Sequence, residues 1–314
     1  MNHQQTHLGA HASVAARALP LFLCAFALTP SAARAVDGVL EINQVCASGP
    51  GCFAGDSPGL PVEITGGTGH SFVLTSDLSV RATGILVQAD DVTIDLNGFR
   101  IIGPNRCSGT PTLGNPITCT LGGSGVGIEA DAQASRTSIY NGSIVGMRSH
   151  GVALGSGSSV RQIRATGNGG MGIRVGGSSF AVVENVAQRN GMDGIGVGNE
   201  GTVRGNRAQF NGDDGIDCGF NCVVVGNTAV GNTTDGITAG AGSVLHENVA
   251  TANLDDGISG GTRVSRNVAR SNDGFGLRLG SSSAYDHNTA VGNSAGQVSL
   301  GQDTGGNFCN PGGC

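Results

Sequence analysis

Four short stretches repeat along the chain: "NGMDGIGV" at residues 190–197, "NGDDGIDC" at 211–218, "NTTDGITA" at 232–239 and "NLDDGISG" at 253–260. Each begins with Asn and reaches a Gly–Ile step four residues later. The complete series of first positions is Asn168, Asn190, Asn211, Asn232, Asn253 and Asn272, at intervals of 19 to 22 residues. Such spacing indicates that one structural unit is repeated along the chain.

A second motif runs in the same register and carries an apolar residue, then Asn, then Ala, as in Val203, Asn206 and Ala208. Stretches such as "GIRV" and "GIGV" alternate apolar and other residues, which is typical of short β-strands. Gly accounts for 56 of 314 residues. That content disfavours helices, because Gly costs about 1 kcal/mol per helical position relative to Ala.

A period near 21 with two or three short strands per repeat predicts an all-β parallel solenoid of about ten coils. Coils would stack at roughly 4.8 Å, so that equivalent residues form columns. We expect the Ile, Val and Ala columns to form the core and the Asn columns to lie at bends. There, Asn tolerates left-handed backbone and its amide can bond to the next coil. The Gly after Asp is expected to occupy another strained turn position.

The chain divides into four predicted segments. Residues 1–35 resemble a secretory signal peptide, with Arg17, an apolar run at 18–28 and "ARA" at 33–35. Residues 36–90 would hold an N-terminal cap and the first strands, 91–300 the repeats, and 301–314 a C-terminal tail. No later apolar run is long enough for a membrane helix. We therefore expect a secreted or periplasmic protein that is not inserted in a membrane.

Cysteine usage fits export. Eight of the nine cysteines lie outside the predicted signal, and an even number in an exported chain indicates disulfides. Although eight cysteines allow 105 connectivities, their grouping predicts pairing between neighbours. The expected pairs are Cys46 with Cys52, Cys107 with Cys119, Cys218 with Cys222, and Cys309 with Cys314. The second pair would staple the base of the loop "CSGTPTLGNPITC" at 107–119.

The charge pattern limits the partners. The net charge is −6, and all 17 basic residues are Arg. Removal of residues 1–35 would leave 15 Arg against 23 acids, a net charge of −8. No basic tract occurs, which disfavours nucleic acid and anionic membrane as partners. An acidic surface is compatible with cations. The sequence gives no basis for an oligomeric state.

The stretch "DVTIDLNGFRIIGP" at 91–104, followed by repeated "DGI", resembles right-handed parallel β-helix proteins of the pectate-lyase-like superfamily. The resemblance covers about residues 90 to 300 and implies a right-handed helix. This superfamily includes polysaccharide lyases, polygalacturonases, epimerases, tailspikes and adhesins. The head "DGVLEINQVCASGPGCFAGD" is similar to a cap on exported bacterial proteins that lack an assigned activity. A fold of this kind implies no single function.

Two groups of residues are candidate sites. The first is a column of acids at and beside one register position: Asp193, Asp213, Asp214, Asp235, Asp255 and Asp256. Asp before Gly is an ordinary turn residue, but close rows of oxygen ligands also suit calcium. The second is the outward column of the "G-I-x" strand, where Arg174 and Asp217 would lie two coils apart, roughly 10 Å. They are the candidate catalytic pair.

Two functions from different classes follow. The first is an exported, non-catalytic binding or surface protein, with calcium as a candidate stabilising ion and a polysaccharide or cell-surface glycan as the expected partner. The alternative is a polysaccharide lyase or glycoside hydrolase that acts on acidic polysaccharide. The absence of Trp, the presence of only two Tyr and the absence of a "GHG…RIK" order after the acids favour the first. A groove beside Arg174 and Asp217 would favour the second.

Overall fold

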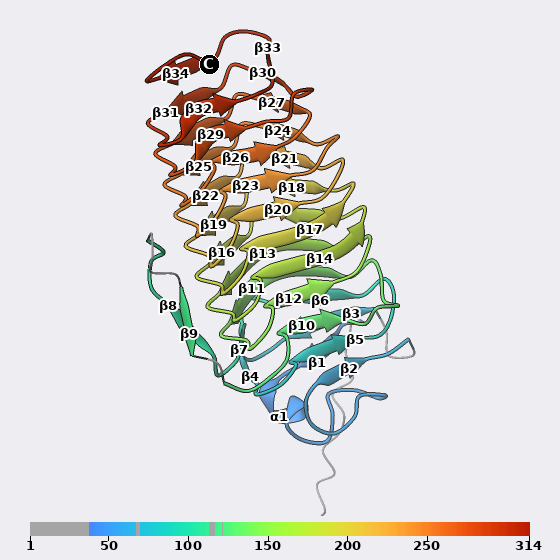
Figure 1. Ribbon diagram of the computed structural model, residues 1–314. Coiled ribbons are helices and arrows are strands. Elements are labelled where there is room, and N and C mark those ends of the chain that lie inside the picture. Colours follow the sequence, from blue (N-terminus) through green and yellow to red (C-terminus); the bar gives the residue numbers. More distant parts are fainter. Residues whose placement is uncertain (1–37, 67–69, 113–116, 121) are drawn as a thin grey trace, which may run out of the picture. The chain divides into compact units, whose positions relative to one another are not determined.

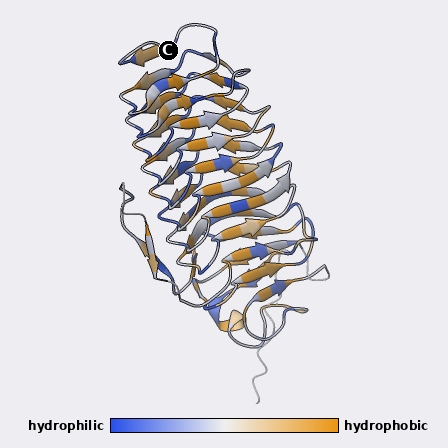
Figure 2. Cartoon of the chain, viewed as in Figure 1, coloured by the Kyte–Doolittle hydropathy of each residue, from blue (hydrophilic) through white to orange (hydrophobic). Residues whose placement is uncertain are grey.

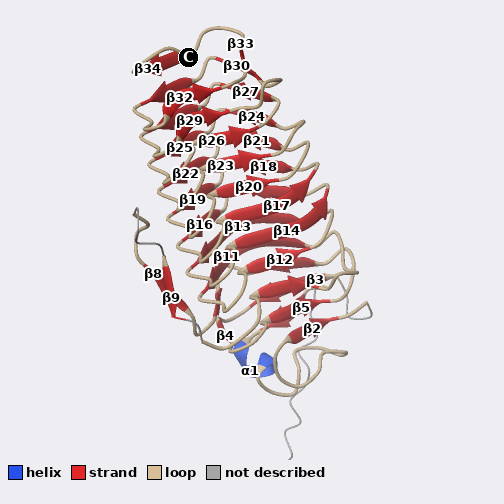
Figure 3. Ribbon diagram, in the orientation of Figure 1, coloured by secondary structure: helices blue, strands red, loops and turns tan. Residues whose placement is uncertain are grey.

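A computed structural model describes residues 38–66, 70–112, 117–120 and 122–314. The predicted signal peptide lies outside these residues. From residue 38 the chain winds into stacked parallel coils with three faces (Figure 1). Within the described chain, α1 (Gln44–Ala47) is the one α-helix, and strands form almost all other regular structure (Figure 3). The prediction of an all-β parallel solenoid is confirmed, with eleven strands on one face in place of about ten.

Face 1 is the eleven-stranded sheet. Its strands, in order along the solenoid, are β2 (Val62–Ile64), β5 (Ile85–Val87), β10 (Ile128–Ala130), β12 (Val152–Leu154), β14 (Ile173–Ser178), β17 (Ile195–Asn199), β20 (Ile216–Cys218), β23 (Ile237–Ala239), β26 (Ile258–Gly260), β29 (Phe275–Arg278) and β32 (Gly296–Ser299).

Faces 2 and 3 are two rows of strands that join in a second sheet. Face 2 holds β1 (Leu40–Ile42), β3 (Ser71–Leu74), β6 (Thr93–Asp95), β15 (Ala181–Val183), β18 (Thr202–Arg204), β21 (Val223–Val225), β24 (Val244–His246), β27 (Arg263–Ser265), β30 (Ala284–Asp286) and β33 (Gln302–Asp303). Face 3 holds β4 (Leu78–Ser79), β7 (Arg100–Ile102), β16 (Val186–Gln188), β19 (Arg207–Gln209), β22 (Thr228–Val230), β25 (Val249–Thr251), β28 (Val268–Arg270), β31 (Thr289–Val291) and β34 (Phe308–Asn310). The longer strands β11 (Ser138–Val145) and β13 (Ser159–Thr166) pass through both faces.

The core consists of stacked apolar columns, as the repeats predict. On face 1 the residues that follow the repeated Gly, from Ile173 to Leu277, are fully buried in six successive coils. The Ala column that includes Ala208 and Ala229 is also fully buried. Hydrophobic and hydrophilic residues alternate along the strands (Figure 2). Because neighbouring coils are in register, each buried side chain packs on its equivalents above and below.

Buried Asn side chains form two ladders that run along the solenoid. The first contains Asn168, Asn190, Asn211, Asn232, Asn253, Asn272 and Asn293; the second contains Asn185, Asn206, Asn227, Asn248, Asn267, Asn288 and Asn307. Each Nδ2 donates to Oδ1 of the next Asn, as from Asn211 to Asn232 at 3.0 Å. Because both backbone and side-chain donors are satisfied, these amides can be buried without an unpaired polar group.

Two details of the predicted bends are wrong. The ladder Asn residues do not adopt left-handed backbone; the residue before each one does, as in Arg189 (φ 52°) and Phe210 (φ 53°). That arrangement frees each Asn to point inward toward its neighbour. The Gly after Asp is not left-handed either. A Cβ at Gly215 would lie 2.6 Å from Nδ2 of Asn232, so close packing of coils, and not backbone strain, requires Gly there.

All four predicted disulfides are confirmed: Cys46–Cys52, Cys107–Cys119, Cys218–Cys222 and Cys309–Cys314. The second one joins β8 (Arg106–Ser108) to β9 (Thr118–Thr120), an antiparallel pair that projects from the coils (Figure 1). No helix in the described chain is long and apolar enough to cross a membrane.

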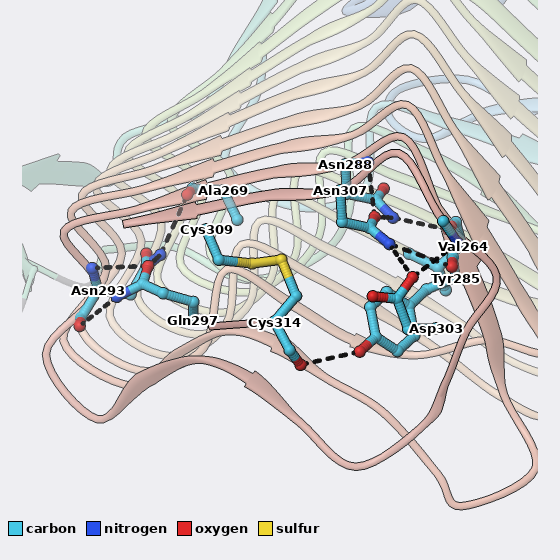
Figure 4. Close-up of a disulfide and its surroundings, with 11 residues drawn as sticks. Val264, Ala269, Tyr285, Asn288, Asn293, Gln297, Asp303, Asn307, Cys309 and Cys314 are labelled. Carbon is cyan, nitrogen blue, oxygen red and sulfur yellow. Dashed lines mark hydrogen bonds between the residues drawn. A yellow bond between two sulfur atoms is a disulfide. The ribbon is translucent and has the colours of Figure 1, made fainter. Parts of the chain in front are cut away.

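The two ends of the coil stack are closed differently. At the N-terminal end α1 buries Ala47, and Asn43 caps the helix. At the C-terminal end Oε1 of Gln297 accepts from Nδ2 of Asn293 at 2.8 Å and so ends the first ladder (Figure 4). The last disulfide lies beside this cap, where the Tyr285 hydroxyl donates to the Cys314 carbonyl at 3.0 Å. These contacts cover an edge that would otherwise be open to pairing.

Candidate functional site: face 1 and its acidic edge

The aspartate column forms a third ladder along the edge of face 1. The backbone N–H of Asp214 donates to Oδ1 of Asp193 at 3.2 Å, and that of Asp235 donates to Asp214 at 3.0 Å. The pattern continues from Asp256 to Asp235 at 2.9 Å and ends where the N–H of Phe275 donates to Asp256 at 2.6 Å. Each carboxylate of the column therefore fixes the turn of the following coil.

Burial and mutual repulsion perturb these acids. Burial, and then the charges of Asp213, Asp214 and Asp217, raise the pKa of Asp193 to about 7. Burial is also the main cause that raises the pKa of Asp235 to about 6, although the N–H bond from Asp256 opposes it. The pKa of Asp214 is raised mainly by burial as well. The column therefore carries less negative charge near neutral pH than its sequence suggests.

Three of the six proposed cation ligands come together. Carboxylate oxygens of Asp235, Asp255 and Asp256 lie within 4.8 Å of one another. Several of their oxygens are already engaged: the Thr238 hydroxyl donates to Asp235 at 3.2 Å, and Arg278 pairs with Asp256 at 3.2 Å. The exposed Asp255 carboxylate is the most available of the three.

The outward column of face 1 has the predicted register. Pairing connects Glu129, Ala153, Arg174, Gly196, Asp217, Thr238, Ser259 and Arg278 in successive strands. Arg174 and Asp217 thus lie two strands apart, roughly 10 Å. They do not form an ion pair in the described chain. Burial, followed by the charges of Asp214 and Asp213, raises the pKa of Asp217. The charge of Arg174 acts instead on His150.

His150 is a residue that the sequence interpretation left out of the site. His150 stands directly before Gly151 and so occupies the register position of the aspartates. Aligning "HGV" at 150–152 with the repeated "DGI" would have placed His150 in this column from the sequence. Its Nδ1 accepts the Met171 N–H at 3.0 Å, just as Asp193 accepts that of Asp214. Burial and then the Arg174 charge lower the pKa of His150. The imidazole is therefore neutral at pH 7 and its Nε2 carries the proton.

A groove of about 330 Å³ borders this part of face 1. Its walls come from β10, β12, β14 and the turns after them, and include Glu129, Gln133, Ser156 and Arg174. Arg174 is exposed and has no ion pair within the described chain. Asp217 and the aspartate column do not line the groove. The site therefore has two parts: an Arg-edged groove, and an acidic edge that begins with Asp193 in the coil after that of Arg174.

Comparisons with known proteins agree with the fold. Residues 124–260 match the family model described as the right handed beta helix region. A mutant of the periplasmic alginate epimerase AlgG is similar, with 13% identity, a TM-score of 0.57, and coverage of 79% of this chain and 74% of that chain. The A-module of Azotobacter vinelandii mannuronan C-5 epimerase AlgE6 matches with 14% identity and a TM-score of 0.52, covering 88% of this chain and 90% of that chain.

These matches confirm the fold that the resemblance implied, a right-handed parallel β-helix. No curated protein sequence matches the chain. At identities of 13% and 14% the likeness establishes the fold and leaves the activity to be argued from the site.

Proposed function

We propose that the chain is an exported β-helix protein that binds acidic polysaccharide on face 1 without converting it. The observation that carries this proposal is the Arg174 guanidinium, which is exposed at the rim of a polar groove and forms no ion pair with any residue that the structure describes. A guanidinium binds a carboxylate through two parallel N–H bonds. Glu129, Gln133 and Ser156 offer acceptors and donors to sugar hydroxyls around it. The names of the structural neighbours, which are epimerases of alginate and mannuronan, support this ligand class.

Export is part of the same proposal. Four disulfides bridge the eight cysteines outside residues 1–35, and disulfides persist in oxidising compartments. A periplasmic or extracellular location would bring the chain into contact with cell-surface glycans.

Binding suits the geometry better than catalysis for two reasons. The candidate base Asp217 lies roughly 10 Å from Arg174, so the arginine cannot neutralise the carboxylate of the sugar from which Asp217 would remove a proton. The other titratable group, His150, has its Nδ1 engaged by a backbone N–H, which leaves Nε2–H as a donor and not as a base. Neither group is placed as a proton acceptor beside Arg174.

Changing Arg174 to Gln should weaken the binding of a short oligogalacturonate about tenfold, because one charge-assisted contact is lost. Microscale thermophoresis of the wild type and the variant measures this change. Arg270→Gln is the matched control, since Arg270 is exposed on face 3 and carries the same charge. A carboxyl-reduced oligomer of equal length should not bind. Equal affinity of Arg174→Gln and the control would remove the basis for the proposal.

The enzyme remains the second candidate, because burial raises the pKa of Asp217 and a carboxyl with a raised pKa is a candidate general acid or base. Its test is prolonged incubation with oligogalacturonate and oligomannuronate. Lyase action would create an unsaturated, ultraviolet-absorbing product, and hydrolysis would create reducing ends. Either product, if lost on Asp217→Asn, would replace the binding proposal with the catalytic one.

Calcium is proposed for one place, the trio Asp235, Asp255 and Asp256. Bound calcium at ten times its dissociation constant should raise the free energy of unfolding by about 1.4 kcal/mol. Urea unfolding with calcium and with chelator measures the difference. Asp255→Asn should abolish it, whereas Asp273→Asn, an exposed acid outside the trio, should not. Identical midpoints of the wild type in both conditions would show that the trio holds no calcium.

A further inference from the structure

A second groove lies on face 2, away from Arg174. Its volume is about 450 Å³, and its lining includes Ser159, Arg161, Gln162, Val183, Glu184 and Arg204. These residues come from three successive coils, through β13, β15 and β18. Register pairs Arg161 with Val183 and Val183 with Arg204. The two arginines therefore stand in one outward column with Val183 between them, roughly 10 Å apart.

The positive charge of this groove exceeds its negative charge, because two arginines and one acid, Glu184, line it. Arg161 and Arg204 are both exposed, and neither forms an ion pair in the described part of the chain. Other arginines are paired, for example Arg100 with Asp77 at 2.7 Å and Arg136 with Asp91 at 2.6 Å. Two unpaired guanidiniums in one groove of an acidic protein mark a place where an anion is favoured.

The rest of the groove suits sugars. Glu184 accepts a hydrogen bond from Gln162 at 3.2 Å, and both can exchange bonds with hydroxyl groups. Tyr140 precedes Arg161 in the same outward column and is half-buried, which places an aromatic residue one coil from the groove. A pyranose ring is about as long as the strand spacing, so alternate rings of a uronate chain would reach Arg161 and Arg204.

Nucleic acid fits less well. Nucleic-acid binding depends on a basic stripe that neutralises several consecutive phosphates, and the lining of this groove supplies only two guanidiniums.

We propose that the Arg161–Arg204 groove is a second binding site for acidic polysaccharide, with each guanidinium paired to a carboxylate of alternate sugars. The ligand class rests on the proposed function, but the site is separate from the Arg174 groove because it lies on another face.

The test compares the wild type, the groove variant Arg161→Gln/Arg204→Gln, the control Arg266→Gln/Arg270→Gln and Arg174→Gln. Arg266 and Arg270 are exposed and unpaired in the described chain, so the control removes equal charge elsewhere. Binding of oligogalacturonate, its carboxyl-reduced form and single-stranded DNA is measured for each protein, together with the thermal unfolding midpoint.

We expect the groove variant to lose at least tenfold in oligogalacturonate affinity, the control less than twofold, and both to keep the wild-type unfolding midpoint. The groove proposal is overturned if the groove variant binds like the control, or if the control loses as much. Single-stranded DNA that binds as tightly as oligogalacturonate and depends on the same arginines would also overturn it. If only Arg174→Gln loses affinity, the proposed function stands and the proposal for the Arg161–Arg204 groove fails. If only the groove variant loses affinity, the groove proposal stands and the proposed binding at Arg174 fails.

Discussion

Replacing Asn227 by Ala is expected to lower the free energy of unfolding by about 4 kcal/mol, since buried partners lose their hydrogen bonds. Oδ1 of Asn227 accepts from the backbone N–H and from Nδ2 of Asn206, at 2.9 and 3.0 Å. Its own Nδ2 donates to the Val203 carbonyl at 2.9 Å and to Asn248 at 3.0 Å. Alanine removes all four bonds and leaves polar groups of two neighbouring coils unpaired.

Urea unfolding of the oxidised protein measures this effect. Thr228→Ala is the matched control, because Thr228 is the next residue and lies half-buried outside the ladder; it should cost less than about 1 kcal/mol. If Asn227→Ala lowered the free energy of unfolding no more than Thr228→Ala does, the hydrogen bonds of the Asn ladder would not be a major source of stability.

Stability is expected to fall as the pH rises from about 4 to about 7. The unfolded Asp193 carboxyl titrates near its ordinary value of 3.8, whereas the folded one has a pKa of about 7. Between these values the folded protein retains a proton that the unfolded chain has released. Raising the pH therefore favours the unfolded state. Asp235, with a folded pKa of about 6, adds to the same trend.

Asp193→Asn should remove most of this dependence. Asn keeps an Oδ1 acceptor for the N–H of Asp214 but carries no charge, and Asp193 is only 6% exposed. We expect the variant to be more stable than the wild type by about 2 kcal/mol at pH 8 and nearly equal at pH 4. Unfolding in urea at both pH values measures this, with the exposed Asp273→Asn as control. If the free energy of unfolding of Asp193→Asn fell with pH as steeply as that of the wild type, titration of Asp193 would not be the cause of the pH dependence.

Much of the fold could be predicted from the repeat because a solenoid turns sequence period into spatial columns. The outward column from Glu129 to Arg278 has the register that the "G-I-x" spacing predicts. The disulfides followed from short separations, which leave each cysteine a near partner. The prediction that Gly215 occupies a strained turn position was wrong for a physical reason. The sequence shows that this position lacks a side chain. It does not show whether backbone strain or the neighbouring Asn232 side chain requires that.

The candidate site was less predictable, because its parts depend on turns of unequal length. His150 could have been placed from its position before Gly151, but the influence of the Arg174 charge on its pKa depends on the coil stacking that brings the two side chains near each other. The face 2 groove shows the same limit. Arg161 and Arg204 are 43 residues apart in the chain, so no basic tract marks them, and only the stacking of coils brings them into one groove.

Arginine side-chain NMR during titration with oligogalacturonate tests the central claim, that unpaired arginines on the outer faces bind acidic polysaccharide, most directly. The Nε–Hε signal of Arg174 should shift and saturate with the ligand, together with those of Arg161 and Arg204. The signals of Arg100 and Arg136, which are held by aspartates, should stay in place. An unchanged Arg174 signal, or equal shifts of all arginines, would contradict the claim.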